Sequence, residues 1–126
     1  MVSIKVLIVE DHADSLEILA IQLQALGYEV IEATTGEEGV GKAQVYHPEI
    51  IVMDLGLPGI DGIEATQRLK NNPQTTHIPV IAYTAWPEDK FRSEGERAGM
   101  SDFLTKPTTA YRFKSTIEKC LKARAN

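Results

Sequence analysis

Polar side chains that can take part in chemistry follow the short apolar segments of this sequence. They are, in chain order, Glu10, Asp11, Asp54, Thr84 and Lys106. Three carboxylates that meet at one place repel one another, so they either raise one another's pKa or hold a cation. Carboxylate oxygens suit Mg²⁺, which keeps several waters and accepts phosphate oxygens as further ligands. These residue types therefore indicate phosphate chemistry supported by a divalent cation.

Asp54 is the candidate nucleophile of this set. Aspartate carboxylates can form acyl phosphates, and phosphoryl transfer asks a protein mainly for alignment and neutralisation of charge. A metal ion held by Asp11 and Asp54 would offset part of the phosphoryl charge, and the Lys106 ammonium would offset more of it. The Thr84 hydroxyl can donate a hydrogen bond to a phosphoryl oxygen. We therefore expect Asp54 to be the group that is modified.

Hydrophobic periodicity predicts five strands, each followed by a helix. The expected strands are 5–9, 28–33, 50–54, 80–84 and 102–105. The first expected helix is 14–26. The other four are expected to begin at Thr35, near Asp61, after Pro87 and after Pro107, and the fifth is expected to end near Ala123. Continuous apolar runs are typical of strands that are covered on both faces, whereas the more polar second strand is typical of a sheet edge. The fourth helix has few apolar residues, so we expect it to be loosely held.

Strands that alternate with helices imply right-handed crossovers and a parallel sheet with helices on both faces. Five such units predict an α/β fold, the flavodoxin-like doubly wound (βα)5 arrangement with a five-stranded parallel sheet in the order 2-1-3-4-5. In that fold, ligands bind beyond the carboxyl ends of the strands, where the strand order reverses. Since the polar residues named above all follow strands, we expect them to meet at that edge.

Composition argues against several classes of protein. The 126 residues include 13 basic and 18 acidic side chains, with a net charge of −5 and no basic block, so we expect no direct binding of nucleic acid. No apolar run approaches the roughly 20 residues of a membrane-spanning helix, and the N-terminus lacks a signal peptide, so we expect no membrane association. The one cysteine, Cys120, cannot form an intramolecular disulfide, which fits a cytoplasmic protein.

Four segments in the correct order and spacing resemble the receiver domain of response regulators in two-component signalling. They are residues 6–11, 51–62, 81–85 and 103–107. The resemblance spans essentially the whole chain, so we expect residues 1–126 to form one receiver (response regulatory) domain. It is similar to single-domain, chemotaxis-regulator-like receivers, and the alternative is a receiver cut from a longer regulator or hybrid kinase.

The resemblance implies a role for each matching residue. Asp54 matches the phosphorylated aspartate, Glu10 and Asp11 match the acidic pair that holds Mg²⁺, and the carbonyl of Gly56 matches the third protein ligand, with Mn²⁺ expected to substitute for the metal. Further matches are Thr84 for the phosphoryl-sensing hydroxyl, Lys106 for the charge-neutralising lysine, Phe103 for the switch aromatic and Lys106–Pro107 for a cis peptide bond.

The resemblance also implies a way of working. Such a chain accepts a phosphoryl group from a sensor histidine kinase or a histidine phosphotransfer protein and signals to a downstream protein through its fourth helix, fifth strand and fifth helix. It is no conventional enzyme, although it catalyses its own phosphorylation and dephosphorylation. Gly56 cannot place an attacking water and Trp86 is bulky, so we expect slow autodephosphorylation. We expect a monomer or a weak, phosphorylation-dependent dimer.

Three other interpretations share this fold or chemistry. A flavodoxin-like cofactor carrier needs a phosphate-cradling loop after the first strand, where this chain has Glu10 and Asp11. An aspartyl phosphatase has a general-acid aspartate two residues after the nucleophile, where this chain has Gly56. A degenerate receiver that acts only as a binding module would lack part of the polar set. His12 adjoins the set and is a candidate influence on its pH dependence.

Overall fold

The computed structural model describes residues 3–125, in which strands and helices alternate along the whole chain. The elements are β1 (Lys5–Val9), α1 (Ala13–Ala25), β2 (Glu29–Ala33), α2 (Gly36–Tyr46), β3 (Ile50–Met53), α3 (Gly62–Lys70), β4 (Val80–Thr84), α4 (Glu88–Ala98), β5 (Asp102–Thr105) and α5 (Ala110–Ala125). The predicted alternation is confirmed. Among the described residues, no helix has both the length and the apolar character needed to span a membrane.

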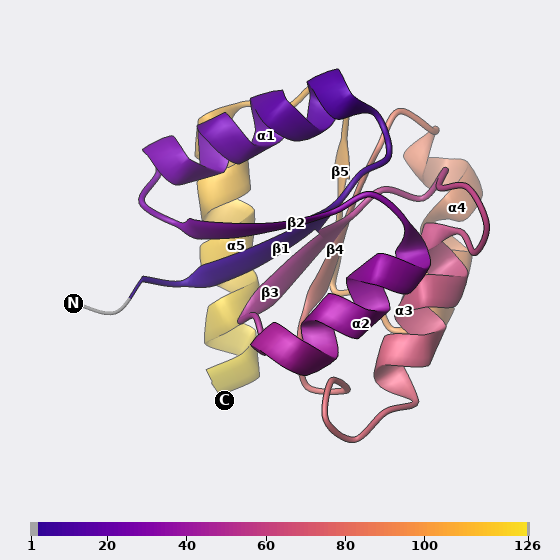
Figure 1. The fold of residues 1–126 in the computed structure, drawn as a ribbon. Helices are drawn as coiled ribbons and strands as arrows, with labels where there is room; N and C mark the ends of the chain where they lie inside the picture. The colour runs from indigo at the N-terminus through magenta and orange to yellow at the C-terminus, as the bar shows by residue number, and fades with distance from the viewer. Residues whose placement is uncertain (1–2, 126) are drawn as a thin grey trace.

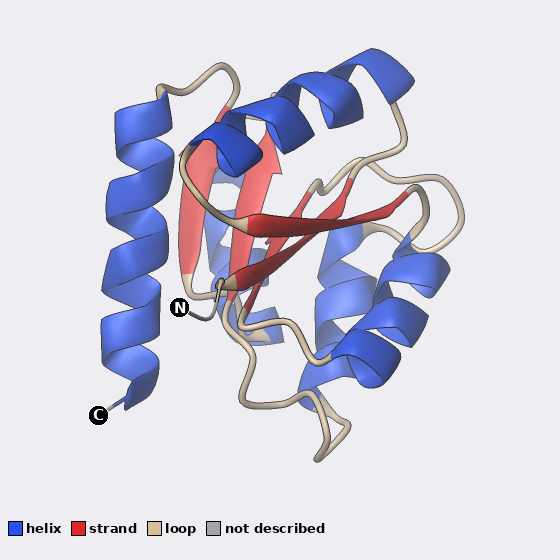
Figure 2. Cartoon of the chain, turned by 60° about the vertical axis from the view of Figure 1, so that its left-hand side comes forward, coloured by secondary structure: helices blue, strands red, loops and turns tan. Residues whose placement is uncertain are grey.

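The five strands form one parallel sheet in the order β2-β1-β3-β4-β5, as predicted. The predicted edge position of β2 is also confirmed. Helices α1 and α5 cover one face of the sheet, and α2, α3 and α4 cover the other (Figure 1). Figure 2 shows the twist of the sheet between these two helical layers. The fold is therefore the doubly wound, flavodoxin-like arrangement that the sequence predicts.

Two hydrophobic cores lie on the two faces of the sheet. Successive residues of a strand point to opposite faces, so Val6 and Ile8 of β1 pack in the core beneath α1 and α5. Leu7 and Val9 of the same strand pack in the core beneath α2, α3 and α4. The exposed fraction of each of these four side chains is 1% or less. This two-sided burial explains why the segment is apolar without alternation.

Capping side chains set the starts of two helices. The Thr35 hydroxyl accepts a hydrogen bond from the Glu38 N–H at 3.0 Å, and the Asp61 carboxylate accepts one from the Glu64 N–H at 2.8 Å. Both satisfy an N–H group that has no partner within the first turn of a helix. The expected starts of α2 and α3 are thereby confirmed. In a capping box, the Glu38 carboxylate would accept from the N–H of the cap residue Thr35. Here it accepts instead from the N–H of the preceding residue, Thr34.

Helix α5 begins a few residues after Pro107, as expected. Its first residue is Ala110, and the Thr109 hydroxyl accepts a hydrogen bond from the Arg112 N–H at 3.1 Å. The chain between Pro107 and Thr109 therefore crosses the carboxyl edge of the sheet as a loop. Helix α4 begins at Glu88, directly after Pro87, close to the expected start.

Candidate functional site

Strand pairing brings the predicted site residues to one edge of the sheet. The last paired residues of β1 and β3 are Val9 and Met53, and the Asp54 N–H donates to the Val9 carbonyl at 3.0 Å. Glu10 and Asp54 thus leave neighbouring strands at the same level. On the other side, the N–H of Lys106 donates to the carbonyl of Thr84 at 2.8 Å, which ties the end of β5 to the end of β4.

The Lys106 ammonium lies between two carboxylates at this edge. Its Nζ donates to Glu10 Oε1 and lies 3.4 Å from Asp54 Oδ2. Glu10 is 2% exposed and Asp54 is 8% exposed, so both carboxylates are largely removed from water. Buried carboxylates require such a partner because an unpaired buried charge is very costly. The contacts therefore form a compact, charge-paired centre.

Burial and charge shift two pKa values in this centre. Burial raises the pKa of Glu10 above its ordinary value, and the nearby Asp54 carboxylate raises it further, against the opposing effect of Lys106. Burial alone would lower the pKa of Lys106, but its hydrogen bond to Glu10 and its attraction to Asp54 raise it overall. Lys106 therefore stays protonated and positively charged at neutral pH.

The arrangement of oxygen atoms fits a hard divalent cation. One ligand atom from each of Glu10, Asp11, His12 and Asp54 lies within 4.8 Å of the others. Asp11 Oδ1 is buried and has no hydrogen-bond partner among the described residues, although His12 Nδ1 lies 3.3 Å away. A buried carboxylate oxygen without a donor is costly unless a cation occupies its lone pairs. The carboxylates present therefore suit Mg²⁺.

His12 joins this cluster although it was not among the predicted metal ligands. Its side chain is 71% exposed, so the imidazole stands at the mouth of the site. The signal in the sequence was its position directly after Asp11. Tyr83 was also missed: its ring lies 5.2 Å from Lys106 Nζ and packs against Phe113. The contact between Tyr83 and Phe113 depends on α5 lying against β4, and nothing in the local sequence indicates that packing.

Thr84 is buried at the end of β4, and its hydroxyl accepts a hydrogen bond from the Trp86 N–H at 3.1 Å. The structure places Thr84 at the edge that carries Asp54, with no hydrogen bond between the two side chains. The indole of Trp86 covers Gly56, since a Cβ atom added to Gly56 would lie 3.0 Å from Trp86 Cζ2. The indole also packs against the Phe91 ring of α4, with ring centroids 4.4 Å apart and the ring planes tilted by 36°.

Gly56 and the loop after Lys106 complete the edge. The Gly56 N–H donates to Asp54 Oδ1 at 3.3 Å, which helps to orient the carboxylate. The Lys106–Pro107 peptide bond is cis in the structure. The structure thus brings Glu10, Asp54, Lys106 and Gly56 into contact, with Asp11 beside them.

Phe103, the expected switch aromatic, is already buried at 6% exposure. A Cβ atom added to Gly95 of α4 would lie 2.5 Å from the Phe103 ring, so the ring packs tightly on the helix backbone. The Arg92 guanidinium lies over the same ring, 5.1 Å from its centroid. The Phe103 ring is therefore already turned inward in this conformation.

Comparison with known proteins decides the family. Residues 6–118 match the family described as the response regulator receiver domain. The chain belongs to this family. As a receiver domain it is a component of two-component signalling, and its acidic site at Glu10, Asp11 and Asp54 is consistent with the Mg²⁺-binding phosphoaspartate site of such domains.

Two named bacterial proteins are similar over nearly the whole chain. The polar-differentiation response regulator DivK of Brucella ovis is 35% identical over 116 residues, which cover 92% of this receiver and 94% of DivK. Protein PilH of Pseudomonas aeruginosa is 33% identical over 117 residues, which cover 93% of this receiver and 97% of PilH.

One solved structure with this fold contains a metal ion. The receiver domain of the sensor histidine kinase PA1611 from Pseudomonas aeruginosa superposes with a TM-score of 0.89 at 28% identity, covering 96% of this chain and 99% of that one. That structure holds a magnesium ion coordinated in its active-site cleft. The likeness agrees with the fit of the oxygen cluster in this receiver to a hard cation.

Proposed function

We propose that this receiver accepts a phosphoryl group on Asp54 from a sensor histidine kinase or a histidine phosphotransfer protein, in a reaction that depends on Mg²⁺. The observation that carries this proposal is the convergence of the Glu10, Asp54 and Lys106 side chains from the ends of three strands. A nucleophilic carboxylate, acidic metal ligands and a fixed ammonium are what phosphoryl transfer requires. The receiver family supports the class of donor.

The transfer makes one bond and breaks one bond. An oxygen of Asp54 forms a bond to phosphorus while the bond between phosphorus and the donor's imidazole nitrogen breaks. The nitrogen keeps the bonding electron pair and takes a proton from solvent, and Asp54 becomes an acyl phosphate. Lys106, charged at neutral pH, stabilises the negative charge on the phosphoryl oxygens. The Gly56 N–H holds the carboxylate in position for the attack.

The proposed metal site consists of the residues that we expected from the sequence. Asp11 and Asp54 would hold Mg²⁺ directly, Glu10 would hold it through a water, and Gly56 would contribute its backbone carbonyl. When bound, the ion neutralises charge on the carboxylates and on the phosphoryl oxygens. Mn²⁺ is expected to substitute because carboxylate, carbonyl and water ligands suit that ion too.

The acyl phosphate is expected to last because water reaches it poorly. Loss of the group requires a water in line with the phosphorus, on the side away from Asp54. Gly56 offers no side chain to hold such a water, and the Trp86 indole covers Gly56. The receiver therefore catalyses its own phosphorylation and only slow autodephosphorylation, and it is no conventional enzyme.

The signal leaves through α4, β5 and α5. The Thr84 hydroxyl accepts from the Trp86 N–H, so movement of Thr84 toward a phosphoryl oxygen would release Trp86 and disturb its contact with Phe91 of α4. Because Phe103 starts buried between Gly95 and Arg92, it would respond by repacking against α4. A downstream protein reads this face, near the exposed Tyr111 ring.

We assign the protein to the cytoplasm, as a monomer or a weak dimer that forms on phosphorylation, with protein partners and no nucleic acid. An aspartyl phosphatase is disfavoured because Gly56 leaves no acid two residues after Asp54.

The test uses acetyl phosphate as donor and intact mass as readout. Wild-type protein is expected to gain one phosphoryl group with Mg²⁺ and none with a chelator, and Asp54→Asn is expected to gain none. Asp61→Asn is the matched control, because it makes the same chemical change at an exposed position where asparagine also caps a helix. Modification of Asp54→Asn to the wild-type extent would refute the assignment of the site.

A further inference from the structure

His12 stands beside the carboxylates of the proposed phosphorylation site without capping the helix that follows it. It is the N-cap residue of α1, but its side chain makes no capping hydrogen bond. Serine, threonine, aspartate and asparagine are the residues that cap helices well, so helix stability does not explain a histidine at this position. The imidazole is exposed at the mouth of the site. The neighbours of its ring therefore decide what it can do.

The Nδ1 atom of His12 is spaced from two carboxylate oxygens as the ligands of one metal ion are. It lies 3.3 Å from Asp11 Oδ1 and 3.6 Å from Glu10 Oε2. Two ligands that bind Zn²⁺ at about 2.0–2.1 Å in tetrahedral directions lie about 3.3–3.4 Å apart. The contact with Asp11 is no hydrogen bond, because the buried Asp11 Oδ1 has no hydrogen-bond partner within residues 3–125. A cation shared by the two atoms would account for their closeness.

Asp54 completes a set of four possible ligands. One atom from each of Glu10, Asp11, His12 and Asp54 lies within 4.8 Å of the others, so small rotations of the exposed His12 side chain and of Asp11 bring them onto one ion. Zn²⁺ is almost always four-coordinate in closed sites and accepts imidazole nitrogen beside carboxylate oxygen. Mg²⁺ instead takes oxygen ligands and keeps several waters. The complete set of four therefore suits Zn²⁺ better than it suits Mg²⁺.

The charge at this edge also matches a divalent ion. The carboxylates of Glu10, Asp11 and Asp54 carry three formal negative charges, and the Lys106 ammonium that pairs with two of them carries one positive charge. Three minus one leaves two negative charges, which Zn²⁺ neutralises. A neutral imidazole adds a ligand to the set without adding a charge. His12 can therefore strengthen the binding of a metal without disturbing this balance.

Imidazole separates the two kinds of ion, because it suits Zn²⁺, whereas carboxylate, carbonyl and water ligands suit Mg²⁺. We propose that Glu10, Asp11, His12 and Asp54 bind Zn²⁺ as a closed four-ligand site, with His12 Nδ1 as the ligand that selects Zn²⁺ over Mg²⁺. A closed four-coordinate ion has no open position for a phosphoryl oxygen, so this form does not accept a phosphoryl group on Asp54. Because it shares its carboxylates with the Mg²⁺ site of the proposed function, the Zn²⁺ site rests on that function and inhibits it.

The test is calorimetric titration of Zn²⁺ and, separately, of Mg²⁺ into the full chain. His12→Gln is expected to weaken Zn²⁺ binding about tenfold or more and to change Mg²⁺ binding by less than about twofold. Glutamine is no better a helix cap than histidine, so the variant leaves the start of α1 comparable. The imidazole nitrogen resonances of His12 are expected to shift with Zn²⁺, with the larger shift at Nδ1. Equal Zn²⁺ affinity in His12→Gln and wild type would overturn the proposal.

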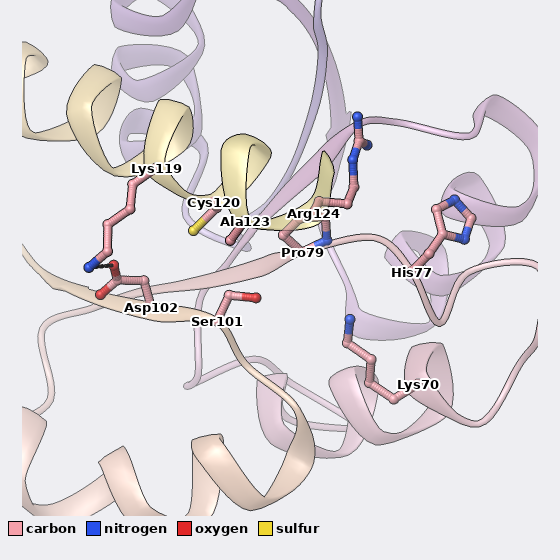
Figure 3. A pocket seen from close by; sticks show the side chains of 9 residues that line it. All are labelled: Lys70, His77, Pro79, Ser101, Asp102, Lys119, Cys120, Ala123 and Arg124. Atoms are coloured by element: carbon pink, nitrogen blue, oxygen red, sulfur yellow. Dashed lines mark ion pairs between the residues drawn. The ribbon is translucent and has the colours of Figure 1, made fainter. Parts of the chain in front are cut away.

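His77→Gln is the matched control, because it removes the same group from an exposed position in the loop before β4. Figure 3 shows His77 on that loop, and Asp102, the carboxylate drawn in the same view, pairs with Lys119 at 3.6 Å. His77→Gln is expected to bind Zn²⁺ as wild type does. Equal weakening of Zn²⁺ binding by His77→Gln and His12→Gln would contradict the assignment of His12 as a ligand.

Modification by acetyl phosphate separates the Zn²⁺ site from the proposed function. With Mg²⁺ present, added Zn²⁺ is expected to suppress modification of wild-type protein more strongly than that of His12→Gln. Full modification of wild-type protein with Zn²⁺ bound would overturn the closed site and leave the proposed function standing. A protein that binds Zn²⁺ through His12 but is not modified with Mg²⁺ alone would refute the proposed function and support the Zn²⁺ site.

Discussion

Lys106 Nζ lies 3.4 Å from Asp54 Oδ2, although 52 positions separate the two residues in the chain. The contact exists because β3 and β5 flank β4 in one parallel sheet and end at the same edge. The same ammonium donates to Glu10, so one cation holds two largely buried carboxylates together. Its removal should therefore affect both stability and the response to metal.

Lys106→Met keeps the length of the side chain and removes its charge. At pH 8 without metal, we expect the free energy of unfolding to fall by about 1–2 kcal/mol, because Glu10 and Asp54 lose their shared partner. Mg²⁺ should raise the melting temperature more in this variant than in wild type, since the ion then supplies the missing positive charge. Thermal unfolding with and without Mg²⁺ measures both effects, and Lys114→Met on α5 is the control. An equal or smaller Mg²⁺ effect in Lys106→Met would contradict this account.

Trp86→Ala uncovers Gly56 and opens a path for water to the acyl phosphate. We expect the phosphoryl group to be lost about tenfold faster, which corresponds to about 1.4 kcal/mol in the barrier. The rate is measured by intact mass after acetyl phosphate is removed. Tyr111→Ala removes an exposed aromatic ring away from the site and should leave the rate unchanged. A wild-type lifetime in Trp86→Ala would show that the indole does not protect the group.

Two glycines inside helices should respond in opposite directions to the same substitution. A Cβ at Gly41 of α2 meets nothing within 4 Å, so Gly41→Ala should stabilise the protein by about 0.5–1 kcal/mol through helix propensity. A Cβ at Gly95 of α4 would meet the Phe103 ring and Met100 Sδ, at 2.5 Å and 3.0 Å, so Gly95→Ala should destabilise it by about 1–3 kcal/mol. Urea unfolding of the pair gives both values. Equal effects of the two substitutions would argue against tight packing of Phe103 on α4.

The Cys120 thiol should react slowly in the folded protein. Burial raises its pKa from 9.0 to about 11, so at pH 8 the reactive thiolate is about 100-fold scarcer than in the unfolded chain. The folded protein then holds more protons than the unfolded one between pH 9 and 11, and this group makes stability fall as the pH rises through that window. Alkylation by iodoacetamide, followed by mass with and without urea, tests the rate, and Cys120→Ser should not be labelled. Similar rates in the two conditions would place the thiol at the surface.

The strands, the sheet order and the meeting of polar residues at one edge of the sheet could be predicted because each has a local signal. Two-sided strands require continuous apolar residues, Thr35 and Asp61 are spaced as helix caps, and residues that follow parallel strands must share an edge. The resemblance to receiver domains rests on short segments of the same kind. Those features therefore follow from the order of residues along the chain.

Contacts between distant segments were decided only by tertiary packing. The burial of Phe103 beneath Arg92 requires α4 to lie on β5, and the indole of Trp86 finds Gly56 only because two strand ends meet. A cleft lined by Lys70 of α3 and Arg124 of α5 likewise joins helices that are far apart in sequence. A residue's type and local spacing determine its backbone and which face it buries, but its neighbours across the sheet depend on how whole elements pack. For that reason the meeting of Glu10, Asp54 and Lys106 at one edge of the sheet could be predicted, and the side chains that cover this edge could not.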